Sequence, residues 1–300
     1  MIAGSTIPLI IALTLAPLMQ SVISRTKAIV AGRAGQQIAQ PYRDLWKLLQ
    51  KGAVYSDTST WIFRMGPVVT LASLLLALAF VPFGGFHSLA AFSGDFIFVA
   101  YLMALGRFFT VAAALDTGSS FEGMGASREV TFSSFAEPAL FLSFAALVRY
   151  TGRLSLDPVL AAIGPRAWAS AAPVLSATIA ALIIVYLSEN ARIPFDDPTT
   201  HLELTMIHEV MVLDHSGPDL AMIEYGAALR MWLFAAIIVG IAAPWRSGNR
   251  WVDTLIGLAA MLTLAVATGL IESSMARLRL LRIPQLLLVA IVLSALALAF

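Results

Sequence analysis

The sequence predicts an all-α membrane protein with about eight transmembrane helices. Of its 300 residues, 59% are hydrophobic and 12% are charged, whereas soluble domains carry roughly 25% charged residues. The apolar residues also gather in runs close to the roughly 20 residues that a helix needs to cross a bilayer. Strands of a membrane barrel would instead alternate in polarity over about 10 residues, and no stretch of this sequence follows that pattern.

Eight apolar runs qualify as spans, and no stretch between them is large enough for a soluble domain. The runs are Ile2–Ile23, Met65–Phe83, Phe96–Leu115, Val130–Val148, Ala172–Leu187, Leu220–Ala243, Leu255–Ile271 and Ile283–Phe300. The first run lacks a basic segment before it and a clear cleavage site, so we expect a retained helix rather than a signal peptide. Residues 1–300 are therefore expected to form one integral membrane domain.

The distribution of basic residues predicts the orientation. The loops on the side that follows the odd-numbered spans carry twelve Lys and Arg residues, and the opposite side carries five. Because basic loops are retained in the cytoplasm, we expect a multi-pass protein of the cell membrane with both termini on the outer side.

The longest polar stretch, residues 24–64, follows the first span on the predicted cytoplasmic side. Within it, Gln40–Lys51 combines apolar and aromatic residues with charged ones, a pattern typical of a short amphipathic helix. Such a helix can lie among lipid headgroups or dock a cytoplasmic partner, and the two roles are compatible. The residues expected to dock a partner are Arg33, Tyr42, Arg43, Asp44, Lys47 and Lys51.

The segment Gly118–Gly125, between the third and fourth spans, is rich in glycine. It lacks the Gly-Lys-Ser/Thr signature and the preceding strand of a phosphate-binding loop. We expect a flexible cytoplasmic turn there.

Residues 189–219, between the fifth and sixth spans, form an acidic segment. It holds seven of the chain's 18 acidic residues, and Arg192 is its only Lys or Arg. Carboxylates near a low-dielectric phase are costly to keep ionised, so we expect this segment to hold or move protons or cations. A solvated acidic loop is the alternative. The acids are Glu189, Asp196, Asp197, Glu203, Glu209, Asp214 and Asp219.

Charged residues also lie inside or beside the spans. Side chains three or four residues apart are neighbours on a helix, yet Glu137 has no base at that spacing, and Glu224 and Arg230 are six residues apart. Such carboxylates form fixed ion pairs with other helices or serve as titrating sites, and their number favours a proton track. The expected track comprises Glu137, Glu189, Glu203, Glu209, Glu224, Asp116 and Glu129, with Arg107, Arg128, Arg192 and Arg230 as charge partners.

The residue types present limit the chemistry of the chain itself. It has no cysteine, which excludes disulfides, thiolate nucleophiles and cysteine-ligated iron–sulfur clusters. His201 and His208 are seven residues apart and not at the i,i+4 spacing of a zinc helix, so we expect no metal site. The net charge of +1 gives no indication of a nucleic-acid partner.

Three sequence blocks carry a family resemblance. They are Gln40–Leu48 (QPYRDLWKL), Gly125–Arg128 (GASR) with Glu137 following, and Glu189–Asp196 (ENARIPFD), accompanied by Glu203-Leu204 and Glu224-Tyr225. In this order they resemble subunit 1 of the proton-pumping NADH:quinone oxidoreductase, complex I. The run Asp197–Glu209 and the tail Glu272–Leu280 depart from the quinone-reducing enzymes. Both are more similar to the homologous subunit of group 4 energy-converting hydrogenases of the formate hydrogenlyase and hydrogenase-4 type.

The resemblance implies a membrane subunit that has no redox centre of its own. It would anchor a soluble redox arm and couple electron transfer there to proton or cation translocation. Nickel–iron and iron–sulfur centres are expected on hydrogenase large/small-like and ferredoxin-like partner subunits, with antiporter-like subunits beside the chain in the bilayer. Three alternatives remain: a complex I subunit with a quinone-site role, a free-standing proton- or cation-coupled transporter, and a passive anchor.

Overall fold

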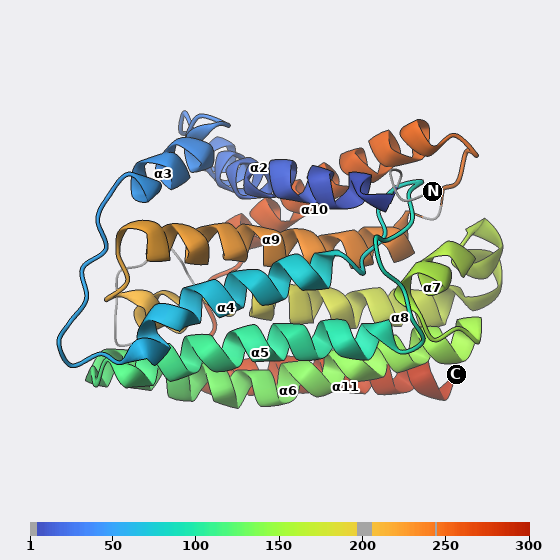
Figure 1. The fold of residues 1–300 in the computed structure, drawn as a ribbon. Coiled ribbons are helices and arrows are strands. Elements are labelled where there is room, and N and C mark those ends of the chain that lie inside the picture. The colour runs from blue at the N-terminus through green and yellow to red at the C-terminus, as the bar shows by residue number, and fades with distance from the viewer. Residues whose placement is uncertain (1–4, 197–205, 244) are drawn as a thin grey trace.

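The computed structural model describes residues 5–196, 206–243 and 245–300 as a bundle of long helices (Figure 1). Within this part of the chain, eight helical segments are long and apolar enough to cross a membrane, so the predicted fold class is confirmed. They are α2 (Ile7–Val30), α4 (Trp61–Leu78), α5 (Asp95–Asp116), α6 (Ser120–Thr151), α8 (Pro165–Glu189), α9 (Gly217–Ala242), α10 (Arg250–Ser274) and the segment Leu280–Ala299.

Four shorter helical elements connect or extend these spans. The amphipathic helix that the sequence predicts is present as α3 (Gln40–Leu49). The others are α7 (Leu156–Ala162) and the 3-10 turns η1 (Glu209–Val212) and η2 (Leu280–Arg282), the last of which leads directly into α11 (Ile283–Ala299).

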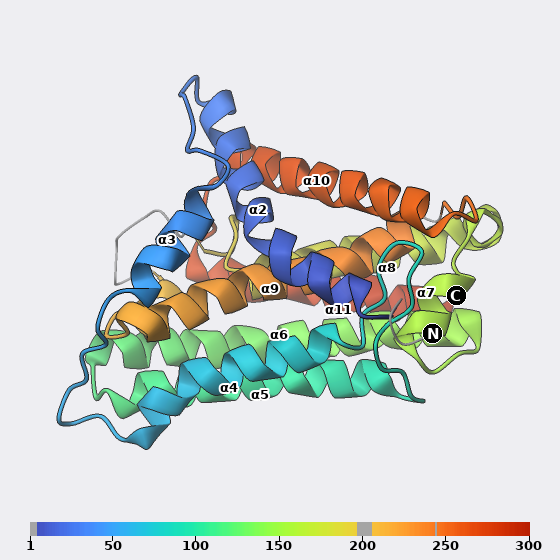
Figure 2. The same ribbon diagram turned by 45° about the horizontal axis from the view of Figure 1, so that its top comes forward.

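Helix α9 occupies the centre of the bundle, between α2 and α10 on one side and α4, α5 and α6 on the other (Figures 1 and 2). Apart from Arg230, every residue from Ala228 to Val239 is buried, so α9 is covered on all its faces, as expected for a helix that is apolar all round. Arg230 is therefore surrounded mainly by protein rather than by lipid, the condition under which charges inside a membrane domain are tolerated, whereas Glu224 nearer the start of α9 is exposed.

Several helices extend beyond the apolar runs that predict them, whereas α4 ends at Leu78, before the predicted end at Phe83. Helix α2 continues to Val30, so the polar loop after it begins later than predicted. Helix α8 begins at Pro165, seven residues before the predicted span, and bends at Ala171, where φ is −133° and ψ is 31°. Pro173 lies just after this bend and has no backbone N–H to donate. Hydropathy alone identifies the apolar part of a helix and misses the polar turns at its ends.

The prediction of a flexible turn over Gly118–Gly125 is wrong for most of the segment. The turn is confined to Gly118, which has a φ of +71°, and Ser119, and α6 begins at Ser120. Gly125 lies inside α6, where η1 packs against it. A Cβ at Gly125 would lie 2.4 Å from Val210 Cγ1 and 2.9 Å from the Ile207 carbonyl oxygen. The glycines of this segment therefore serve close helix packing as well as the turn.

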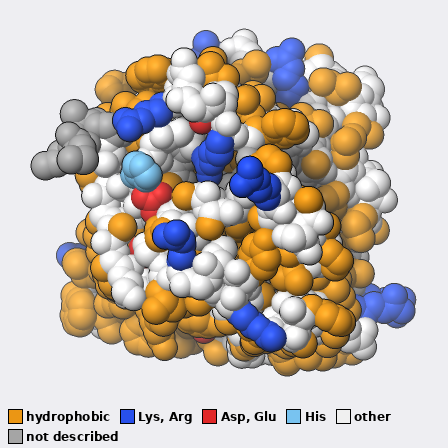
Figure 3. Space-filling view, turned by 90° about the vertical axis from the view of Figure 1, so that its right-hand side faces the viewer, with side chains coloured by type: hydrophobic (Ala, Val, Ile, Leu, Met, Phe, Trp, Pro, Cys, Tyr) orange, Lys and Arg blue, Asp and Glu red, His pale blue; other side chains and the backbone are white. Residues whose placement is uncertain are grey.

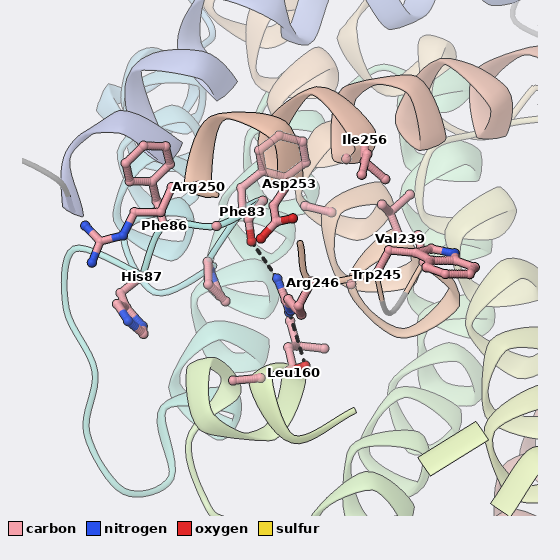
Figure 4. A pocket seen from close by; sticks show the side chains of 18 of the residues that line it. Phe83, Phe86, His87, Leu160, Val239, Trp245, Arg246, Arg250, Asp253 and Ile256 are labelled. Atoms are coloured by element: carbon pink, nitrogen blue, oxygen red, sulfur yellow. Dashed lines mark hydrogen bonds between the residues drawn. The ribbon is translucent and has the colours of Figure 1, made fainter. Parts of the chain in front are cut away.

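The two ends of the bundle differ. Helix α3, the α5–α6 turn and the start of α9 gather at the left of Figure 1, and α7, the start of α2 and the end of α11 lie at the right. Figure 3 views the right-hand end, over which basic side chains are scattered. A cavity of about 350 Å³ opens there, and Arg246 at its wall donates to the carbonyl oxygens of Gly84 and Leu160 (Figure 4).

Gly125→Ala is expected to lower the free energy of unfolding by about 1–3 kcal/mol, the usual cost of overpacking, because η1 must move away from α6. Gly123→Ala is the matched control, since a Cβ there meets no atom within 4 Å and alanine is the better helix former by about 1 kcal/mol. Thermal unfolding of the purified protein in detergent would measure both changes. Equal stability of the two variants would contradict the proposed packing.

Candidate functional site

The centre of the candidate site is Arg107 of α5, which binds three carboxylates from two other helices. Its Nη2 donates to both carboxylate oxygens of Glu189 at 2.6 Å, and its Nη1 lies 2.5 Å from Glu137 Oε1. Its Nε lies 3.2 Å from Glu129 Oε1. A guanidinium has five N–H donors in a planar fork, so one arginine can hold acids arriving from three directions.

These partners come from distant parts of the chain. Glu129 and Glu137 lie on α6, and Glu189 is the last residue of α8, 82 positions after Arg107. The side chains of Arg107, Glu129 and Glu189 are 8%, 8% and 6% exposed, and that of Glu137 is 40% exposed. Paired charges inside a membrane domain avoid the high cost of an isolated buried charge. The interhelical partner that the sequence requires for Glu137 is therefore Arg107.

Two further groups extend this cluster. Arg230 of α9 lies within electrostatic reach of Glu189 and Glu129, and its guanidinium makes no hydrogen bond to any residue that the structure describes. The Nε2 atom of His208, in the segment before η1, lies 3.4 Å from Glu129 Oε2. Burial, with Arg230 nearby, lowers the pKa of His208 to about 4. His208 is consequently neutral at physiological pH.

A second ionic cluster joins α10, α2 and the end of α8. The fully buried carboxylate of Glu272 lies 2.8 Å from Lys27 Nζ and 3.4 Å from Arg192 Nη1. Tyr186 is also fully buried close to this cluster and accepts a 3.4 Å hydrogen bond from Thr268. Arg192 thus binds Glu272, the residue that directly follows the predicted span Leu255–Ile271.

A third ionic contact anchors the segment between α8 and α9. Asp196 Oδ1 lies 3.0 Å from Arg277 Nη2, and Asp196 Oδ2 accepts the backbone N–H groups of Ile207 and His208 at 2.9 and 3.2 Å. The Leu278 N–H also donates to the Pro194 carbonyl oxygen. Asp196 therefore connects the start of the acidic segment to its later part and to the α10–η2 connection.

Glu224 of α9 lines a cavity of about 400 Å³ between α2, α3 and α9. Lys27, Arg192 and Asp44 line the same cavity. Lys27 and Arg192 also bind Glu272. The cavity beside α3 therefore reaches the buried Glu272 cluster.

Other predicted site residues are not among the ion-pair partners of Arg107. Asp116 accepts hydrogen bonds from the backbone N–H and the hydroxyl of Thr60, at 2.6 and 2.9 Å, and so binds the residue that caps α4. Arg128 donates to the Met206 carbonyl oxygen at 2.8 Å, and Glu209 begins η1. Glu203 lies outside the described residues.

The predicted docking residues divide into two groups. Arg33, Arg43, Asp44, Lys47 and Lys51 are exposed. Tyr42 is only partly exposed, and its hydroxyl donates to the Thr14 carbonyl oxygen of α2, so it holds α3 against the bundle. Trp46 and Leu49 are 65% and 54% exposed. Helix α3 thus carries an outer face that is both basic and apolar.

Sequence reasoning missed the roles of Glu272, Lys27, Asp196, Arg277 and His208. The first four pair across more than one helix or loop, and their spacing in the sequence gives no signal for those pairs. A signal was available for Glu272, because a carboxylate at the end of an apolar run requires a partner. His208 was visible as a histidine within an acidic segment, but its burial was not.

Comparisons with known proteins show which proteins the chain is similar to. A family model described as NADH dehydrogenase matches residues 4–300. The chain is 30% identical to formate hydrogenlyase subunit 4 of Escherichia coli K12, with 91% of each chain covered. It is 31% identical to hydrogenase-4 component C of the same bacterium, with 97% of this chain and 93% of that relative covered.

The chain is also similar to two proteins at lower sequence identity. A subunit of the NADH-quinone oxidoreductase of Bordetella avium is 26% identical, with 67% of this chain and 58% of that relative covered. A chain of the membrane-bound sulfane sulfur reductase, an archaeal respiratory membrane complex, has a TM-score of 0.80 over 98% of both chains at 18% identity. The two chains therefore share a fold.

Replacing Arg107 by Met is expected to lower the free energy of unfolding by about 3–5 kcal/mol, the usual cost of removing one partner from a buried ion pair. Adding Glu129→Gln and Glu189→Gln to Arg107→Met should restore much of the loss, because the unpaired buried charges disappear. Arg43→Met, at an exposed position, is the control and should have little effect. Thermal unfolding in detergent would measure the series, and failure of the combined variant to recover stability would contradict the electrostatic account.

Proposed function

The chain belongs to the NADH dehydrogenase family, and from this premise we propose that it couples a soluble redox arm to ion movement across the membrane. Its resemblance to complex I subunit 1 and to the group 4 hydrogenase subunits is confirmed. It is homologous to membrane subunits of both, and its relatives are subunits of multisubunit membrane complexes. The higher identity and coverage favour the hydrogenase type of complex for this chain.

The observation that carries the proposal is the Arg107 cluster. Three carboxylates and two arginines lie together inside the membrane domain, where charges are costly and usually functional. The Glu272–Lys27–Arg192 cluster and the cavity beside Glu224 extend this set of charges toward the end of the bundle that carries α3.

The proposed mechanism is electrostatic. Reduction of a redox centre in an arm docked at α3 changes the charge at that end of the bundle. Carboxylates in a low-dielectric surrounding respond to a nearby charge by binding or releasing protons. Moving one charge against 100 mV costs about 2.3 kcal/mol, which a modest redox step supplies. In this proposal Glu224, Glu189, Glu129 and Glu137 carry the response, and the other described residues of the predicted track, Asp116 and Glu209, are not bound to Arg107.

The proposed complex contains a soluble arm and further membrane subunits, and it lies in the cell membrane. The arm would consist of hydrogenase large/small-like and ferredoxin-like subunits that carry nickel–iron and iron–sulfur centres, since this chain has no cysteine to ligate them. Antiporter-like subunits would complete the ion path in the bilayer. The described residues include no group of three or more potential metal ligands. The protein would lie in the cell membrane with both termini outside, since the basic α3 region would face the cytoplasm.

A second candidate is a quinone-site role of the complex I type. The cavity between α2, α3 and α9 favours it, because this space of about 400 Å³ has apolar walls at Leu45 and Leu48 as well as the charged groups named above. Quinone dependence of electron transfer in the purified complex would distinguish this role from the hydrogenase type.

The docking role predicts a specific loss of the arm. Arg43→Glu combined with Lys47→Glu reverses two exposed charges of α3, so the soluble subunits should no longer co-purify although this chain still inserts. Arg250→Glu, exposed at the opposite end, is the control and should retain the arm. Recovery of the arm at normal yield with the double variant would exclude α3 as its docking surface.

The coupling role predicts that Glu224→Gln reduces ion translocation per turnover. Glutamine preserves the size of the side chain but cannot exchange a proton. Turnover of the arm with an artificial electron carrier should remain. Asp157→Asn, a carboxylate that pairs with His87 outside the track, is the control. Coupling would be measured as the pH change across reconstituted vesicles, and unchanged coupling in Glu224→Gln would remove this residue from the track.

A further inference from the structure

Another cavity, of about 590 Å³, lies between α6, α8 and α11, at the right-hand end of Figure 1 where α6 and α11 end. Helix α11 packs along both α6 and α8, and α8 is kinked at Ala171, which lines the cavity. The cavity is therefore found where the kink interrupts the close packing of the three helices. Its apolar wall consists of Ala146, Ala171, Pro173, Val174, Ala297 and Phe300.

The polar residues that line this cavity are Arg149, Tyr150 and Ser170, and all three are exposed. The hydroxyl groups of Tyr150 and Ser170 share a hydrogen bond of 3.0 Å, which joins the end of α6 to the start of α8. Arg149 Nη1 donates to the Leu298 carbonyl oxygen of α11, so the guanidinium is held at the cavity. A guanidinium has five N–H donors, and to the residues that the structure describes Arg149 gives only this one bond. Most of its donors are therefore available to a ligand.

The cavity extends from the level of the lipid headgroups into the hydrocarbon layer. Arg149 lies two residues before the end of α6 at Thr151, a rise of about 3 Å. Its partner Leu298 lies next to the end of α11 at Ala299. Val174 at the apolar wall is farther in, about 13 Å along α8 from its start at Pro165. A molecule that fills this space therefore needs a polar end and an apolar end.

The charge around the cavity is positive. No acidic side chain lines it. Arg153 and Arg166 are exposed and lie four residues from the lining residues Arg149 and Ser170. The side of the membrane predicted to face outward carries only five Lys and Arg residues in total, and three of them are at this one place. Since basic residues are favoured on the opposite side, this local excess points to a negatively charged ligand.

We propose that this cavity binds an anionic phospholipid, with its phosphate on Arg149 and an acyl chain along the apolar wall. The planar fork of a guanidinium matches a phosphate group and binds it through two parallel hydrogen bonds. Tyr150 and Phe300 place aromatic rings at the headgroup level, where such residues are enriched. A zwitterionic lipid fits less well, because its ammonium group meets no carboxylate here. The site is separate from the Arg107 and Glu272 clusters, so the proposal does not depend on the function proposed above.

The test measures lipid binding to the purified full-length chain in a neutral detergent. Phosphatidylglycerol is expected to raise the midpoint of thermal unfolding, because a ligand that binds the folded state stabilises it, whereas phosphatidylethanolamine with the same acyl chains is not. Arg149→Gln should weaken the affinity for phosphatidylglycerol about tenfold, the usual effect of losing a hydrogen bond to a charged group. Arg250→Gln, an exposed base at the same end of the bundle that does not line this cavity, is the control and should retain the normal affinity.

A second variant tests the cavity itself. Val174→Trp fills the space without changing the charge, so it should also prevent binding, and it provides the result if Arg149→Gln does not fold. Equal affinity for the two lipids, or normal affinity in either variant, would overturn the proposal. So would equally tight binding of glycerophosphoglycerol, the same headgroup without acyl chains, because the apolar wall would then have no role.

The assembled complex provides the last measurement. Native mass spectrometry is expected to find one phosphatidylglycerol fewer on the complex that carries Arg149→Gln than on the unmodified complex. Equal numbers of retained lipids would show that another subunit covers the cavity in the assembly, and the proposal would then be wrong.

Discussion

The structure depends on one constraint, which is that charges inside a membrane domain must be compensated within the protein. Arg107 fulfils it for Glu129, Glu137 and Glu189, at distances of 3.2, 2.5 and 2.6 Å. Because these acids come from α6 and α8, their attraction to one guanidinium on α5 also fixes how the three helices lie together. Such a cluster stabilises little relative to an apolar core, so its presence is better explained by function than by folding.

The placement of α9 in the centre of the bundle is the second condition for the site. Its middle part, Ala228–Val239, is buried on all sides apart from Arg230, so it carries Arg230 without exposing it to hydrocarbon, whereas Glu224 lies nearer its start and is exposed. Arg230 adds positive charge beside the Arg107 cluster, and Glu224 reaches the cavity next to α3. A single buried helix therefore links the interior charges to the end of the molecule where the soluble arm is proposed to dock.

The acidic segment between α8 and α9 connects these parts. Asp196 binds Arg277 and two backbone N–H groups, and His208 brings a neutral imidazole to within 3.4 Å of Glu129. Because the pKa of His208 is lowered by burial, a change in its surroundings that admits water would favour its protonation. These contacts hold the segment close to the Arg107 cluster, which it is proposed to influence. Gly125 also allows η1 to pack directly on α6.

The sequence by itself determined the fold class, the eight spans and helix α3, because hydropathy and amphipathic periodicity are local properties that the bilayer selects for. It also indicated that Glu137 needs a partner outside its own helix. Only the tertiary structure decided that this partner is Arg107, that Asp116 binds the N-cap residue Thr60 of α4, and that Glu272 pairs with Lys27 and Arg192. These contacts join residues 30 or more positions apart, and several bases were available to each acid. Their pairing follows from how the helices pack around α9, which no local pattern encodes.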